Sequence, residues 1–303
     1  MQVHTIDLMH GGFPRRIAAY LLLGPGGPLL IETGPSSCHR ALEEALAGHG
    51  FEPRDIEHVF VTHIHLDHAG GAGWWARQGS TVYVHTLGAP HLIDPSRLVA
   101  SAGRLYGDRM EELWGDIPPA PAERVRIVAD GEIVRAAGLD IEALETPGHA
   151  SHHHAYRIAD LAFTGDLAAI VIPDTNLIEL PTPPPEYDLD LWQRSLDRIA
   201  ALRLDAIYPT HFGRVDDVSD HLEHVSSLLG EATEFVRQGL QDGLPRSEIV
   251  SAFISWTHDR FVSAGATEEQ LRDLADFNPP VLSLVGILRY WKKTQGLVPS
   301  DET

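Results

Sequence analysis

The sequence contains a single cysteine, Cys38, among 303 residues. A lone cysteine cannot form a disulfide within the chain, and it excludes a zinc site built from thiolates. We therefore expect the cytoplasm as the compartment. Cys38 lies in the stretch 36–46, whose apolar spacing predicts an amphipathic helix capped by serine. Packing is favoured over a nucleophilic role for this thiol.

Long hydrophobic runs are also missing. No stretch approaches the roughly 18 consecutive apolar residues that a membrane-spanning helix needs, so we expect none. The start of the chain, Met1 to Asp7, lacks a basic region followed by an apolar core, and it predicts no secretory signal. We expect no membrane partner.

Positive charge is scarce. The formal net charge is −20 at pH 7, and Lys292 and Lys293 are the only lysines. An acidic surface repels phosphate backbones and anionic lipid, and no basic run occurs that could form a nucleic-acid groove. The charge therefore predicts no nucleic-acid partner.

The overall composition is that of a globular protein. Hydrophobic residues make up 43% of the chain and charged residues 22%, which is near the usual range. A length of 303 residues fits one large domain or two small ones.

Histidine is concentrated in one short string. Directly after the apolar run 59–61, the segment 62–71 reads Thr-His-Ile-His-Leu-Asp-His-Ala-Gly-Gly. Neutral imidazole and carboxylate suit zinc and other borderline divalent ions, and no packing role needs so many titratable groups at a strand end. The string predicts a metal site, with ligands drawn from His63, His65, Asp67 and His68.

Three later segments each end an apolar stretch with one more metal-binding side chain. The alternating run 141–144 leads to Thr-Pro-Gly-His, which ends at His149. The run 161–165 is followed by Asp166, and the run 206–210 is followed by His211.

Together these segments resemble the metallo-β-lactamase superfamily, in its glyoxalase II-like hydrolase branch. The resemblance implies that His63, His65 and His149 hold one metal and that Asp67, His68 and His211 hold a second. Asp166 would bridge the two ions, and Asp67 would also orient the hydroxide between them. Two divalent ions are implied, zinc first, with iron and manganese as alternatives.

The resemblance also implies the fold. It is an α+β four-layer αββα sandwich with an all-helical C-terminal extension, which agrees with the alternation of predicted strands and helices. We expect a catalytic domain over 1–216 and a helical extension over 217–303. The extension should contain four helices, over 221–241, 247–262, 267–277 and 281–295. Aromatic residues on them could form a contact face in a homodimer, although a buried core within the extension is the simpler account.

The implied activity is hydrolysis, in which a metal-bridging hydroxide attacks an acyl carbon. The resemblance implies a small-molecule acyl substrate, either a thioester or a lactone, and phosphoester cleavage by the same metal pair stays open. A redox enzyme of the sulfur-dioxygenase type, with a single iron, is the main alternative. A scaffold protein without activity is disfavoured because no ligand of the motif is missing.

Other residues near the motifs carry secondary predictions. Glu32 stands where the superfamily usually has aspartate, and a supporting role behind the ligands is plausible for it. Histidines 152–154 are expected to lie at a strand start rather than to add ligands. The segments 91–121 and 172–188 are predicted to form walls of the substrate pocket.

Overall fold

The computed structural model describes residues 1–172, 174, 175 and 177–302. By its internal contacts the chain divides into two compact units. The first comprises Met1–Thr146, His152–Gly165 and Leu202–Val218, and the second comprises Pro147–Ser151, Asp166–Ala201 and Ser219–Thr303. The expected division into a catalytic domain over 1–216 and a helical extension over 217–303 stays a prediction.

A six-stranded sheet lies in the first unit. Its strands, in spatial order, are β1 (Gln2–Asp7), β2 (Ala18–Gly24), β3 (Gly27–Ile31), β4 (His58–Phe60), β5 (Thr81–His85) and β6 (Val125–Val128). The first three strands are antiparallel, and β3 to β6 are parallel. The glycine-rich turn between β2 and β3 closes a hairpin, with Gly24 paired to Gly27.

The second sheet has five strands and lies against the first. Its order is β13 (Ala206–Pro209), β10 (Leu161–Gly165), β9 (His154–Ile158), β8 (Leu139–Glu145) and β7 (Ile133–Ala136). Within this sheet the β10–β13 pair is parallel and the other pairs are antiparallel. One buried core cluster joins the two sheets, and it includes Tyr20 and Phe60 from the first and Tyr156 and Phe163 from the second.

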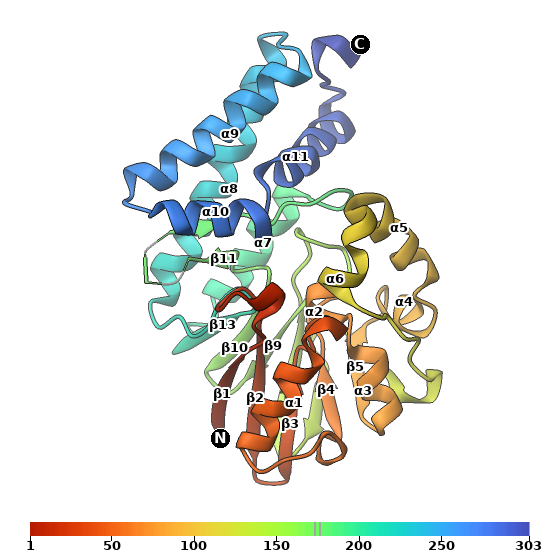
Figure 1. Ribbon diagram of the computed structural model, residues 1–303. Coiled ribbons are helices and arrows are strands. Elements are labelled where there is room, and N and C mark those ends of the chain that lie inside the picture. The colour runs from red at the N-terminus through yellow and green to blue at the C-terminus, as the bar shows by residue number, and fades with distance from the viewer. Residues whose placement is uncertain (173, 176, 303) are drawn as a thin grey trace. The chain divides into compact units, whose positions relative to one another are not determined.

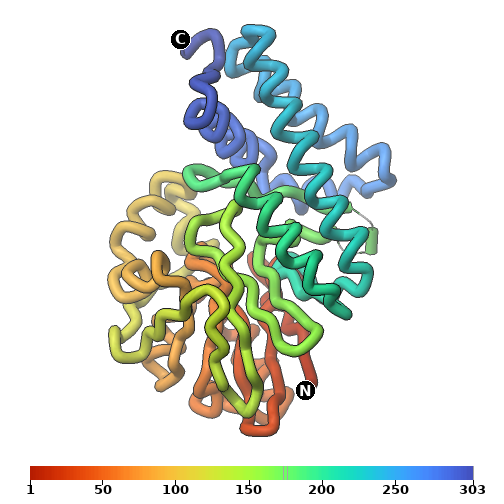
Figure 2. The backbone as a smooth tube through the Cα atoms, turned by 180° about the vertical axis from the view of Figure 1, so that it is seen from behind, coloured from red at the N-terminus to blue at the C-terminus, as the bar shows by residue number. Residues whose placement is uncertain are grey.

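The helices of the first unit follow or precede its parallel strands. They are α1 (His39–Gly48), α2 (Leu66–Ala69), α3 (Ala72–Gln78), α4 (Ala89–Ile93), α5 (Ser96–Tyr106) and α6 (Met110–Trp114). Figure 1 shows α1 and α3 in front of the six-stranded sheet, whereas Figure 2, seen from behind, brings the yellow-green strands of the second sheet to the front. The six-stranded sheet is therefore covered by helices on one face and by the second sheet on the other.

The second unit contains a two-stranded ribbon and five helices in its described part. These are β11 (Ile170–Val171), β12 (Ile178–Glu179), α7 (Leu189–Ala200), α8 (Val218–Gln241), α9 (Arg246–Ser263), α10 (Glu268–Phe277) and α11 (Pro280–Gln295). The last four confirm the predicted helical region. Figures 1 and 2 show α8 beside α9, where Phe235 stacks on Trp256 with ring centroids 5.5 Å apart. Among the described residues, no helix is long and apolar enough to cross a membrane.

Cys38 is buried as predicted, with 4% of its surface exposed, and burial raises the pKa of its thiol to about 11. The serine cap predicted for its helix is wrong. Residues Ser36–Cys38 form a 3-10 turn, and α1 begins at His39 with Cys38 as its N-cap. The short turn supplies the first hydrogen bonds of the helix, so no serine side chain is needed there.

Candidate metal centre

The histidine string lies in the connection that leaves β4. His63 and His65 precede α2, and this four-residue helix carries Asp67 and His68. His63 and His68 are fully buried. Imidazoles buried this deeply need polar partners, because an unsatisfied buried nitrogen is costly.

One predicted ligand group lies entirely in the first unit. His211 follows β13, and its Nε2 lies 3.4 Å from Asp67 Oδ2. The same carboxylate oxygen is 3.7 Å from His68 Nε2. One ligand atom from each of these three residues lies within 4.8 Å of the others, so together they could hold an ion.

His149 and Asp166 meet in the second unit. His149 Nε2 lies 3.3 Å from Asp166 Oδ2, and both residues are 2% exposed. Gly148 places this imidazole against α7. Its φ is +141°, and a Cβ there would lie 2.3 Å from the Cα of Trp192. Only glycine allows so close an approach of the backbone to the helix.

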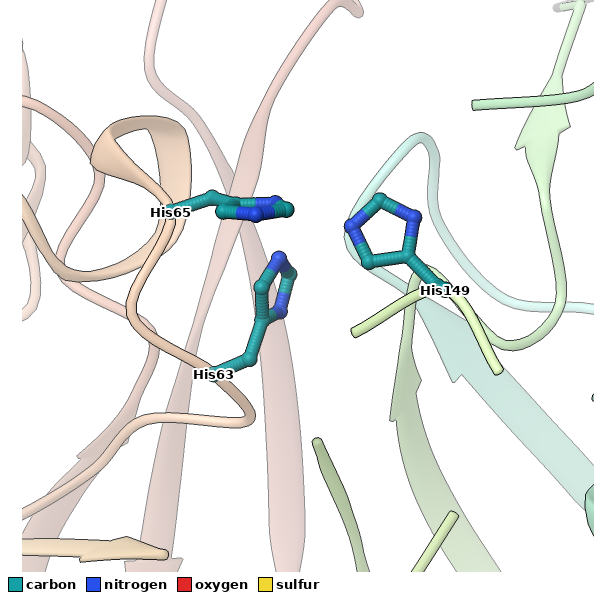
Figure 3. A group of neighbouring side chains, drawn as sticks. All are labelled: His63, His65 and His149. Atoms are coloured by element: carbon teal, nitrogen blue, oxygen red, sulfur yellow. The ribbon is translucent and has the colours of Figure 1, made fainter. Parts of the chain in front are cut away.

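Two further groups contain the remaining predicted ligands. Figure 3 shows His63, His65 and His149 with their rings facing one another, and one nitrogen of each lies within 4.8 Å of the others. His63, His68 and Asp166 form another group under the same limit. All seven residues predicted from the sequence therefore occur in these three groups. Their roles as ligands stay predictions.

The orientation of the imidazoles fits metal binding. In four of them Nδ1 is hydrogen-bonded to an oxygen, which makes Nε2 the nitrogen that carries the lone pair. A metal-ligating histidine has this arrangement, because its second nitrogen donates to a carboxylate, carbonyl or hydroxyl. The oxygen partners are Thr62 Oγ1 for His63 (3.1 Å), Glu32 Oε1 for His68 (3.1 Å), the Pro181 carbonyl for His149 (2.7 Å) and the Arg16 carbonyl for His211 (2.6 Å).

Glu32 lies behind the first-unit ligands and is fully buried. Its Oε1 accepts hydrogen bonds from Thr62 Oγ1 (2.5 Å), His68 Nδ1 (3.1 Å) and Thr210 Oγ1 (3.1 Å), and Oε2 accepts one from Thr62 N (3.3 Å). Thr62 precedes His63 and Thr210 precedes His211, so one carboxylate connects three ligand positions. Its backbone φ of +67° is strained for a residue with a side chain.

Histidines 152–154 occupy three different environments. His153 Nδ1 hydrogen-bonds to Thr146 Oγ1 (2.8 Å), and His152 Nδ1 lies 3.5 Å from the amide nitrogen of Ile64, which donates to it. His154 begins β9, and its ring centroid is 4.7 Å from that of His85. With Glu145, these last two histidines form a fourth group whose ligand atoms lie within 4.8 Å of one another.

The fourth group is better explained as a hydrogen bond between the buried His85 and the partly exposed Glu145. The Leu87 amide donates to His85 Nδ1 (3.0 Å), so the proton of the neutral ring is on Nε2, which lies 3.2 Å from Glu145 Oε1. A metal at Nε2 would require that proton to leave and the Leu87 hydrogen bond to break. Burial is the main cause that lowers the pKa of His85, so the neutral form is favoured.

The two predicted wall segments both contact the ligand motifs. Within 91–121, Leu113 and Trp114 pack with Leu66, which lies between His65 and Asp67. Within 172–188, the Pro181 carbonyl is the acceptor for His149 Nδ1. Pro173 and Asn176 of that segment lie outside the described residues. The role of segments 91–121 and 172–188 as walls of a substrate pocket stays a prediction.

Sequence reasoning missed the carbonyl groups of Arg16 and Pro181. Backbone acceptors have no sequence signal, because every residue carries one. Thr62 and Thr210 directly precede two of the predicted ligands. A hydroxyl directly before a histidine at a strand end is the signal that could have marked them as supporting residues.

Replacing Gly148 with alanine is expected to lower the free energy of unfolding by about 2 kcal/mol, because the new methyl group would overlap the backbone of α7. Chemical denaturation measures this. Gly131→Ala is the matched control, since Gly131 also has a positive φ (+71°) but no described atom within 4 Å of an added Cβ. Equal losses of unfolding free energy in the two variants would contradict the close packing of Gly148 against α7.

Comparison with known proteins gives the family of this arrangement. The profile of the Metallo-beta-lactamase superfamily matches residues 12–211, about two thirds of the chain, and the match spans all seven predicted ligands. The chain belongs to the metallo-β-lactamase superfamily. The predicted membership of the superfamily is confirmed, and so is the predicted fold with its C-terminal helical region, whereas the glyoxalase II-like branch stays a prediction.

A solved structure has the same fold, and curated proteins are similar in sequence. The crystal structure of metallo-beta-lactamase family protein TTHA1429 from Thermus thermophilus covers 96% of this chain and 93% of its own, with a TM-score of 0.68 and 23% identity. The metallo-beta-lactamase fold-containing protein ST1585 of Sulfurisphaera tokodaii is 25% identical over 236 residues, which are 74% of this chain and 84% of that protein.

An atrochrysone carboxyl ACP thioesterase of Aspergillus fumigatus is 26% identical over 199 residues. The match covers 64% of this chain but only 37% of that longer protein. Family membership and the candidate metal groups together support a metal-dependent hydrolase.

Proposed function

We propose that this protein is a dinuclear metal-dependent hydrolase that cleaves an acyl substrate, with a thioester as first choice and a lactone as second. The observation that carries the proposal is the orientation of four imidazoles, each of which has Nδ1 tied to an oxygen and Nε2 as its lone-pair nitrogen. The superfamily match supports the same chemistry.

The ligand assignment follows the groups of neighbouring side chains. His63, His65 and His149 would hold one ion, and Asp67, His68 and His211 would hold the other. Asp166 would serve both, since it groups with His63 and His68 and its Oδ2 is also 3.3 Å from His149 Nε2. Zinc suits a set of imidazoles and carboxylates, and iron and manganese accept the same set.

A bound pair of divalent ions would supply a water ionised near neutral pH and would polarise the acyl oxygen. The chain's own contribution is positional. His63 and His68 have fully buried side chains, whereas the Asp67 side chain is 20% exposed. Asp166, the other carboxylate of the predicted set, is 2% exposed, so Asp67 is the partly exposed carboxylate among the predicted ligands and is placed to accept a hydrogen bond from the attacking water and to orient it. We assign it the catalytic role.

The reaction adds water across the acyl bond. A thioester yields a carboxylic acid and a free thiol, and a lactone yields a hydroxy acid, so the same site serves both. The net charge of −20 disfavours polyanionic substrates such as nucleic acid. A relative that is named as a thioesterase supports the choice of thioester over lactone.

Release of free thiol from a panel of acyl thioesters tests the proposal. We expect zinc-loaded or manganese-loaded protein to release thiol, and we expect His63→Ala to lower kcat/KM by on the order of 100-fold or more. A panel of lactones is assayed in parallel. Turnover of lactones alone would change the proposed substrate class from thioesters to lactones. If fully metallated protein hydrolyses neither panel, acyl hydrolysis is contradicted.

A further inference from the structure

The connection from β1 to β2, residues 8–17, has an unusual backbone. Four of its residues have positive φ, namely Met9 (51°), Gly11 (64°), Gly12 (82°) and Arg15 (59°). Glycine adopts this region freely, but Met9 and Arg15 are strained there. Strain of this kind persists only where surrounding contacts hold it, and it is typical of functional segments.

Asp7 supplies contacts at both strained residues. Its Oδ1 accepts the Met9 amide at 3.0 Å, and its Oδ2 accepts the Arg15 amide at 2.8 Å. A single carboxylate therefore closes the loop at its two ends. Hydrogen bonds to an ionised acceptor are about twice as strong as neutral ones, so this clamp can offset the strain that it spans.

The loop ends on a metal-ligand candidate. Arg16, which directly follows the clamped Arg15, is 4% exposed, and its carbonyl accepts a hydrogen bond from His211 Nδ1 at 2.6 Å. The Ala18 amide donates to the Thr210 carbonyl at 2.8 Å. The Arg16 carbonyl is the hydrogen-bond partner of the His211 ring, and Nε2 of that ring lies 3.4 Å from Asp67 Oδ2.

Two side chains of the loop fix its middle. His10 is 2% exposed, and its Nε2 hydrogen-bonds to the Leu113 carbonyl at 2.9 Å. The Arg16 guanidinium lies over the Phe13 ring, 4.0 Å from the centroid. The middle of the loop is therefore held by contacts that do not involve Asp7, whereas Asp7 accepts the amides of Met9 and Arg15 at its two ends.

We propose that Asp7 is a positioning residue for His211 and so sets the affinity of the metal position formed by Asp67, His68 and His211. Asp7 acts through Arg15 and the Arg16 carbonyl. The inference rests on the proposed dinuclear function. Removing the partner that orients a metal-ligating histidine typically weakens metal binding about 10- to 100-fold.

The test is zinc titration of metal-free full-length protein in competition with a chromophoric chelator. The wild-type chain is expected to bind two ions. Asp7→Asn keeps the size of the side chain but replaces one acceptor oxygen with an amino group, so one of the two hydrogen bonds is lost. We expect one ion to bind about tenfold more weakly and the other with unchanged affinity.

Two further variants make the result specific. Asp140→Asn removes a charge from an exposed pair with Arg135 on the β7–β8 hairpin, and it should leave both affinities unchanged. Adding Arg15→Gly to Asp7→Asn removes the strain at that position and should recover part of the lost affinity. Unchanged affinities in Asp7→Asn, or equal weakening of both ions, would overturn the positioning role. A wild-type chain that binds fewer than two ions would instead contradict the dinuclear proposal.

Discussion

Replacing Asp166 with alanine is expected to lower kcat/KM for acyl hydrolysis by on the order of 1,000-fold or more, because no other carboxylate of the described residues groups with the ligands of both metal positions. Asp166 groups with His63 and His68, and it lies 3.3 Å from His149 Nε2. Steady-state kinetics with saturating zinc measure the effect. Asp166→Asn, which keeps the shape and loses the charge, should be impaired nearly as much.

The same substitution should leave the chain folded. Asp166 follows β10 and is not part of the core cluster that joins the sheets. Asp160→Ala is the matched control, because Asp160 is an exposed residue at the other end of the same strand. Circular dichroism should give both variants the wild-type spectrum. Full activity in a folded Asp166→Ala protein would contradict the proposed role of this carboxylate.

Replacing Glu32 with alanine is expected to have the largest effect on stability among the residues behind the site. The change would leave the hydroxyls of Thr62 and Thr210 and the Nδ1 of His68 without their buried acceptor. Each such loss costs about 1 to 3 kcal/mol, so we expect the free energy of unfolding to fall by about 3 kcal/mol or more. Metal affinity should fall about 10- to 100-fold as well.

Denaturant unfolding and chelator competition measure the two effects. Glu142→Ala serves as a control for loss of a glutamate, because its carboxylate makes a partly exposed pair with Arg157 at 3.4 Å and should contribute less than about 1 kcal/mol. Glu32→Asp tests the extra methylene, since the shorter side chain cannot reach all three donors from the same backbone. If Glu32→Ala unfolds and binds zinc as the wild type does, the network behind the ligands has no energetic role.

Much of the candidate site could be predicted because its residues are adjacent in sequence or end a strand. His63, His65, Asp67 and His68 are brought together by local geometry, in the turn that leaves β4 and in α2. His149 and His211 were found because a lone histidine after an apolar run is a conspicuous pattern. One ligand atom of each residue lies within 4.8 Å of the others in the groups that the resemblance implied, and their roles as ligands stay predictions.

The parts that could not be predicted depend on the backbone. The clamp formed by Asp7 requires positive φ at Met9 and Arg15, and nothing in the residue types at those positions favours it. The group of His85, Glu145 and His154 arises from the ends of three strands, two in one sheet and one in the other. Such pairings depend on sheet register and packing, which a single sequence does not reveal.

The helical region illustrates the same limit. Its helices were predicted within a few residues because glycine and proline breaks separate them. The sequence did not predict that Pro147–Ser151 and Asp166–Ala201 belong to the same compact unit as these helices. That unit is defined by contacts between segments far apart in the chain. Ser283 Oγ, for example, donates to the Leu180 carbonyl at 2.7 Å, across 103 positions of sequence.

The most direct test of the central claim is stepwise addition of zinc to metal-free protein, with the rate of thioester hydrolysis recorded at each step. The account predicts that activity stays low until the first equivalent is bound, rises with the second, and reaches its plateau at two ions per chain. A plateau at one ion per chain, or hydrolysis by the metal-free protein, would contradict a dinuclear hydrolase.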